Sequence, residues 1–115
     1  MADGYIRLRC GERKPVAVHA AALSGTLTIM VNPTPICTLY DSAGNELSGC
    51  TDMPVSGYDL QPLTSPRVWR NLDTNWPWKL ASGFYTLVFR FGVIGSDGIE
   101  RMFVCSVIVQ VQEER

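Results

Sequence analysis

Hydrophobic and polar residues alternate along most of the chain with a period of two residues. This alternation is typical of strands that bury one face, because successive side chains of a strand point to opposite sides. Proline, glycine, asparagine and aspartate separate the alternating segments and indicate turns. The expected strands cover residues 5–10, 15–20, 26–31, 36–40 and 67–72, with one or two short strands near 46–50 and 53–58.

The most regular alternation lies near the C-terminal end, in two segments joined by the sequence IGSDG. The Asp97-Gly98 pair supplies residues that tolerate the positive φ angles of a tight turn. The pattern therefore predicts a long antiparallel hairpin with one apolar face. The residues expected on that inner face are Tyr85, Leu87, Phe89, Phe91, Val93, Phe103, Cys105, Val107, Val109 and Val111.

No segment keeps an apolar helical face for three turns, and the strand count is about seven to nine. Short strands with regularly spaced turn signals are typical of a β-sandwich. A chain of 115 residues is one domain by size, so residues 1–115 are expected to form a single all-β, antiparallel sandwich.

The second face of the first hairpin segment carries more apolar residues than a solvent-facing strand needs. Phe84 and Val88 share a parity with Arg90 and point away from the expected core. Two explanations remain open: a loop of this chain covers them, or another subunit does. These three residues are therefore candidates for an interface.

The composition excludes several classes of partner. Hydrophobic residues make up 46% of the chain and the net charge is −1, so no basic surface indicates nucleic acid. No apolar run is long enough to span a membrane. The first residues lack an apolar signal-peptide segment, so we expect synthesis in the cytoplasm, where the four cysteines stay free thiols. With one histidine and no CxxC pair, we expect no metal and no cofactor.

The segment LASGFYTL, residues 80–87, resembles the start of the penultimate strand of immunoglobulin-like domains. Gly83 and Tyr85 match the family pattern, in which the tyrosine hydroxyl bonds back to the preceding turn. Leu87 stands where antibody-type domains place a cysteine, so the antibody disulfide is absent. The turn in TLYDSAGNEL, which begins at Thr38, is similar to bacterial and phage immunoglobulin-like domains. The resemblance implies an immunoglobulin-like sandwich of the kind found in phage tail, baseplate and capsid-associated proteins.

Trp69, Trp76 and Trp78 form a cluster of aromatic residues in the segment VWRNLDTNWPWKL. Such residues are common in interfaces because they bury a large area with few rotatable bonds. They would also make a platform for sugar rings. The competing interpretation is that they pack at the end of the sandwich, since tryptophan is mostly buried in proteins.

The sequence contains no motif that indicates catalysis. His19 has no nucleophile or carboxylate near it in sequence, and Cys10 has only scattered basic residues beside it. We therefore expect a non-enzymatic structural or protein–protein interaction module, with a phage or prophage virion component as the favoured setting. A carbohydrate-binding sandwich is the alternative. The expected partners are proteins, including a homo-oligomer or a larger assembly.

Overall fold

The computed structural model describes residues 4–9, 13–21, 25–47, 49–73 and 81–112. These residues form nine strands and no helix, which confirms the all-β prediction. The strands are β1 (Gly4–Arg9), β2 (Arg13–His19), β3 (Leu27–Ile29), β4 (Ile36–Tyr40), β5 (Met53–Pro54), β6 (Gly57–Tyr58), β7 (Arg67–Asp73), β8 (Gly83–Gly95) and β9 (Glu100–Gln112).

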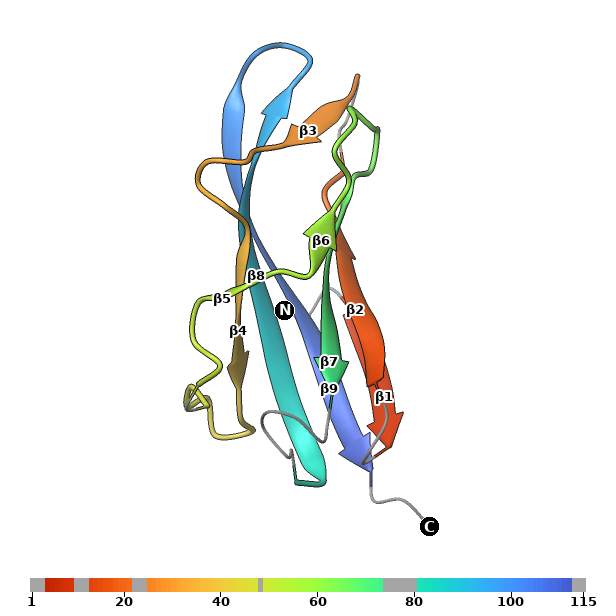
Figure 1. The fold of residues 1–115 in the computed structure, drawn as a ribbon, viewed down its shortest axis with the longest axis vertical. Coiled ribbons are helices and arrows are strands. Elements are labelled where there is room, and N and C mark those ends of the chain that lie inside the picture. The colour runs from red at the N-terminus through yellow and green to blue at the C-terminus, as the bar shows by residue number, and fades with distance from the viewer. Residues whose placement is uncertain (1–3, 10–12, 22–24, 48, 74–80, 113–115) are drawn as a thin grey trace.

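The strands form two sheets that pack along the long axis of the molecule (Figure 1). The larger sheet has six strands in the order β1-β9-β8-β4-β5, and β3 pairs with the far end of β8. The smaller sheet has the order β2-β7-β6. All pairs are antiparallel except β1 with β9, which is parallel, so the purely antiparallel prediction needs that correction. The parallel pair places β1 at the edge of the larger sheet.

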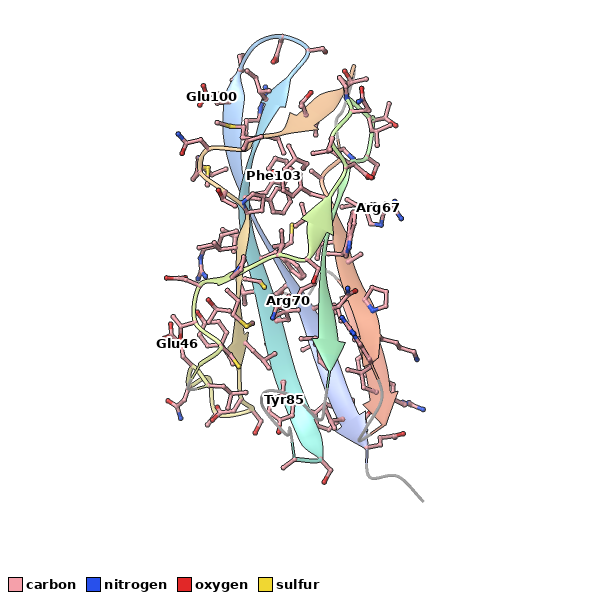
Figure 2. All side chains as sticks on the ribbon, viewed as in Figure 1. Glu46, Arg67, Arg70, Tyr85, Glu100 and Phe103 are labelled. Atoms are coloured by element: carbon pink, nitrogen blue, oxygen red, sulfur yellow. The ribbon has the colours of Figure 1, made fainter. Side chains whose placement is uncertain are left out.

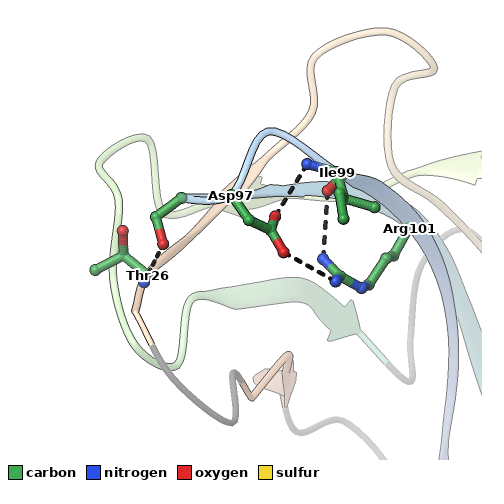
Figure 3. Close-up of polar contacts among 5 residues, drawn as sticks. Thr26, Asp97, Ile99 and Arg101 are labelled. Carbon is green, nitrogen blue, oxygen red and sulfur yellow. Dashed lines mark hydrogen bonds and ion pairs between the residues drawn. The ribbon is translucent and has the colours of Figure 1, made fainter.

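The predicted hairpin is present as β8 and β9, which pair from Gly83 opposite Val111 to Ile94 opposite Glu100. Its turn is held by Asp97, whose carboxylate accepts a hydrogen bond from the Ile99 amide at 3.0 Å. A second carboxylate oxygen of Asp97 lies 3.1 Å from the Arg101 guanidinium (Figure 3). These two contacts, the backbone one first, lower the pKa of Asp97. The turn is therefore built from its own side chains, as its sequence indicates.

The core lies between the two sheets and follows the predicted parity. The larger sheet supplies Leu87 and Phe89 from β8, and the smaller sheet supplies Val68 and Leu72 from β7; all four are fully buried. Phe91 stacks on Phe103 with ring centroids 5.8 Å apart. Burial of these side chains is the main stabilising contribution to the fold. One face of β8 therefore packs in the core, and its other face points away from the core.

Two local predictions need correction. The strand expected at residues 15–20 begins two residues earlier, because β2 starts at Arg13 and pairs Pro15 with Asn71. Proline is accepted there because β2 is an edge strand of the smaller sheet. A strand near residues 46–50 is reduced to a single bridge between Tyr40 and Glu46.

The tyrosine corner implied by the family resemblance is present. Tyr85 lies at the start of β8, and its hydroxyl donates a 2.7 Å hydrogen bond to the carbonyl oxygen of Ala81. Gly83, between the two, has φ of 148°, a conformation that favours glycine. The contact ties the entry of β8 to the preceding turn, in agreement with an immunoglobulin-like sandwich.

Replacing Tyr85 with phenylalanine is expected to lower the free energy of unfolding by about 1 kcal/mol, because one intramolecular hydrogen bond is lost. Urea denaturation measures the change. The matched control is Tyr5→Phe, which removes a hydroxyl bonded to Gln110 on the exposed surface and should cost less. Equal effects of the two substitutions would contradict a special role for the Tyr85 contact.

Candidate functional site

The candidate site is the surface of the six-stranded sheet that faces away from the smaller sheet, called here the outer face. Its residues alternate with the buried core residues of the same strands. The pairing registers bring them into rows across four strands. The outer face comprises Tyr5 and Arg7 of β1, Met102, Val104, Ser106, Ile108 and Gln110 of β9, Phe84, Thr86, Val88 and Arg90 of β8, and Ile36, Thr38 and Tyr40 of β4.

The centre of the outer face is apolar and open. Phe84 is 51% exposed, Met102 64% and Val104 65%, whereas Val88 and Ile108 between them are half-buried. Single exposed apolar residues are normal on a protein surface, but a contiguous group across two paired strands is not. The central strands β8 and β9 therefore present apolar surface on both sides of the sheet.

Glycine at position 92 lets two methionines pack onto the outer face. A Cβ at this position would lie 2.9 Å from the Met30 sulfur and 3.2 Å from the Met102 sulfur. The backbone is also tied at this point, where the Met30 amide donates a 2.8 Å hydrogen bond to the Gly92 carbonyl. The flexible thioethers extend the apolar surface upward along β8 and β9.

A groove of about 560 Å³ opens on the same face, at the end nearest the tyrosine corner. The turn after β4 forms one wall, because the Asp41 carboxylate accepts 2.9 Å hydrogen bonds from the amides of Ala43 and Asn45. This arrangement is the local turn that the segment TLYDSAGNEL indicates. The groove is lined by Tyr40, Asp41, Ser42, Gly44, Phe84, Tyr85, Thr86, Val88 and Ile108.

Charged residues border the apolar centre near β4. Arg90 lies on β8 and its pKa is raised, first by a hydrogen bond with the Tyr40 side chain and then by the charges of Asp52 and Glu46. Thr38 is buried beneath this group, and its hydroxyl accepts a 3.0 Å hydrogen bond from the Asp52 amide. Glu46 lies at the β4 side of the molecule (Figure 2). This border holds more negative than positive charge.

The structure brings together three of the six residues that the sequence singled out. Phe84, Val88 and Arg90 lie on the outer face, as predicted from their parity. Two explanations were open for Val88: a loop of this chain covers it, or another subunit does. The residue is half-buried, so this chain covers it only in part. Phe84 remains half exposed. The interface assigned to these residues stays a prediction.

Trp69 lies elsewhere, on the side of the smaller sheet that faces away from the core. It is half-buried and pairs with Gly57, where an added Cβ would lie 2.5 Å from the indole ring. The Arg67 guanidinium sits 5.5 Å from the ring centroid. Trp69 is thus neither a core plug nor part of the outer face. Trp76 and Trp78 lie outside the described residues.

Sequence reasoning missed Met102, Val104 and Ile108, which lie on the outer face beside Phe84 and Val88. The signal was available, because these residues have the opposite parity to the buried valines of β9. An apolar residue at both parities indicates a strand covered on both sides. Because β8 and β9 pair in this register, the outward apolar residues of the two strands form one patch.

The described cysteines belong to the core and not to a reactive site. Cys37 and Cys50 are fully buried, and burial raises the pKa of the Cys37 thiol to about 11 despite the nearby Arg70 guanidinium. Arg70 lies between the sheets, where it donates a 2.7 Å hydrogen bond to the Pro54 carbonyl (Figure 2). Cys10 lies outside the described residues.

No cluster of three or more histidine, cysteine, aspartate or glutamate side chains with metal-binding geometry occurs in the described ranges. None of the described segments forms a helix that could cross a membrane.

No protein-family model matches the chain, and no curated protein matches it. Among solved structures, the chain is similar to CopC from Methylosinus trichosporium OB3b, with 20% sequence identity and a TM-score of 0.37. The similarity covers 100% of this chain and 90% of CopC. At this identity and TM-score, the similarity carries no argument about what this chain binds.

The comparison corrects the functional hypothesis drawn from the sequence. The solved structure found is a CopC and not a virion protein, so the comparisons support neither the phage or prophage component nor its alternative, a carbohydrate-binding sandwich. Both are withdrawn. The position of Trp69 agrees with the second withdrawal, because its ring is half covered and lies over Gly57. The all-β sandwich itself stands.

Proposed function

We propose that this chain works by binding a protein partner through the outer face of its six-stranded sheet. The observation that carries the proposal is the exposure of Phe84, Met102 and Val104 on the two central strands, which the half-buried Val88 and Ile108 connect into one apolar surface. Contiguous apolar surface of this kind marks interaction sites in soluble proteins.

The arrangement of the outer face supports a protein partner over a small molecule. Interfaces between proteins have an apolar centre, aromatic or methionine anchors and a polar border. Phe84 and Met102 are such anchors, and the border includes Arg7 on one side and Glu46 on the other. The groove of about 560 Å³ beside Phe84 has room for apolar side chains of a partner.

Site-specific photo-crosslinking tests the proposal. A photoreactive amino acid is placed at Val104 on the outer face and, as a control, at Ala17, which is exposed on the smaller sheet. In cells that produce the protein, the Val104 probe is expected to give a protein adduct of defined mass. The same adduct should disappear when Phe84→Asp is added.

Each outcome of this experiment decides the proposal. An adduct from position 104 that depends on Phe84 supports it, and mass spectrometry identifies the adduct partner. Equal labelling from positions 104 and 17, or adducts that survive Phe84→Asp, would show that the outer face is not a specific binding surface.

A further inference from the structure

We infer that the partner on the outer face is a second copy of this chain, related by a two-fold axis that runs parallel to the strands. This inference rests on the proposed function and names its occupant. It follows from three properties of the outer face: the distribution of charge at its two edges, the height of those charges along the strands, and the size of the face.

The two edges of the outer face carry opposite charge. At the β1 edge, Arg7 is exposed, and the Lys14 ammonium lies 3.5 Å from the Arg7 carbonyl. At the β4 edge, Glu46 is exposed and forms a β-bridge with Tyr40. Asp41 lies in the turn directly after β4. Strands β1 and β4 lie on opposite sides of the sheet in Figure 1. Arg90, which lies between the edges, already has a hydrogen bond with the Tyr40 side chain and lies near the charges of Asp52 and Glu46.

The charges of the two edges stand at nearly the same height. Arg7 pairs with Gln110, which pairs with Phe84. Tyr40, the bridge partner of Glu46, pairs with Thr86, one outer-face position further along β8. A two-fold axis parallel to the strands leaves each residue's position along the strands unchanged. It places the β1 edge of one copy opposite the β4 edge of the other. It therefore brings Arg7 of each copy opposite Glu46 and Asp41 of the other.

The same axis passes over the apolar centre. The midpoint between the β1 and β4 edges falls between β9 and β8, where Phe84, Val104 and Ile108 lie. A two-fold axis perpendicular to the strands would instead place β1 against β1 and reverse the positions along the strands, so Arg7 of one copy would not lie opposite Glu46 or Asp41 of the other. Charge complementarity thus selects the parallel axis, with an apolar centre and paired charges at the border.

The area of the outer face suits a reversible dimer. Four strands at about 4.8 Å spacing, with a mean length of about nine residues at about 3.3 Å per residue, give about 600 Å² per copy. A typical stable interface buries about 800 Å² per partner, and transient ones bury less. We therefore expect self-association that depends on concentration and weakens as salt screens the border charges.

A charge exchange between two variants tests this arrangement. Arg7→Glu and Glu46→Arg each place like charges opposite one another twice in the homodimer, and each is expected to weaken self-association about tenfold. An equimolar mixture of the two variants restores both attractions, so it should associate as wild type does. Sedimentation velocity from micromolar to millimolar concentration measures all three samples, and circular dichroism checks that both variants fold.

The control and the contrary outcomes are specific. Arg7→Glu mixed with wild type retains one attraction and one repulsion, so it should associate less than wild type alone. Stronger association of that mixture would overturn the inference. Variants that associate as wild type does would overturn it too. A wild-type chain that stays monomeric, but whose Val104 probe labels a different protein, would overturn the second copy while leaving the proposed function intact.

Discussion

Replacing Phe84 with aspartate is expected to weaken self-association of the chain about 100-fold or more. Phe84 is 51% exposed in the single chain and lies on a central strand of the outer face, at the level of Arg7. In the dimer, the substitution removes two aromatic anchors and leaves two carboxylates to be buried without partners. Sedimentation velocity over a concentration series measures the change in the dissociation constant.

The matched control is Leu60→Asp, which makes the same kind of change at a residue that is 71% exposed and lies outside the outer face. It should leave the dissociation constant near that of wild type. Both variants are expected to unfold in urea within about 1 kcal/mol of wild type, because surface substitutions have small effects on stability. A Phe84→Asp protein that associates as tightly as Leu60→Asp would contradict the assignment of the interface.

The buried thiol of Cys37 is expected to make the folded state lose about 2–3 kcal/mol of stability in alkaline solution. Burial raises its pKa from 9.0 to about 11. The folded state therefore binds this proton more tightly than the unfolded state does. The contribution is fully present below about pH 9 and is lost as the pH rises from there through about 11. Urea denaturation at a series of pH values measures the loss.

The substitution Cys37→Ala isolates this effect from the titration of tyrosine and lysine. The variant is less stable at neutral pH because it leaves a small cavity, but its stability should fall less steeply above about pH 9 than that of wild type. Val109→Ala, a change of similar size at a buried residue that does not titrate, serves as the control and should keep the wild-type slope. If the free energy of unfolding fell equally with pH for wild type and Cys37→Ala, the Cys37 thiol would not be the source of the pH dependence.

The pattern of period two was sufficient to predict the sandwich and its longest hairpin. It works because the core face of β8 and β9 is selected by burial alone, and residues such as Leu87 and Phe89 reveal the parity directly. The tyrosine corner could be predicted from Gly83 and Tyr85 because a local turn forms it. Short strands such as β5 and β6 were less visible, since two residues carry no period.

The site was only half visible in the sequence, for a physical reason. Phe84 and Val88 were recognisable on one strand, but the patch exists only because β8 and β9 pair in one register. Register between strands is a property of the folded chain. For Trp69, the aromatic side chain indicated an interface. In the structure the ring packs on its own sheet, because Gly57 opposite it has no side chain. Side-chain character alone could not separate these cases.

Hydroxyl-radical footprinting of the unmodified chain tests the central claim most directly. Phe84 and Met102 are exposed on the outer face, and Leu60 is exposed outside it. If the outer face binds a second copy, oxidation of Phe84 and Met102 should decrease as the protein concentration rises, while oxidation of Leu60 stays constant. Oxidation of Phe84 and Met102 that is independent of concentration, under conditions where sedimentation shows dimers, would contradict the outer face as the interface.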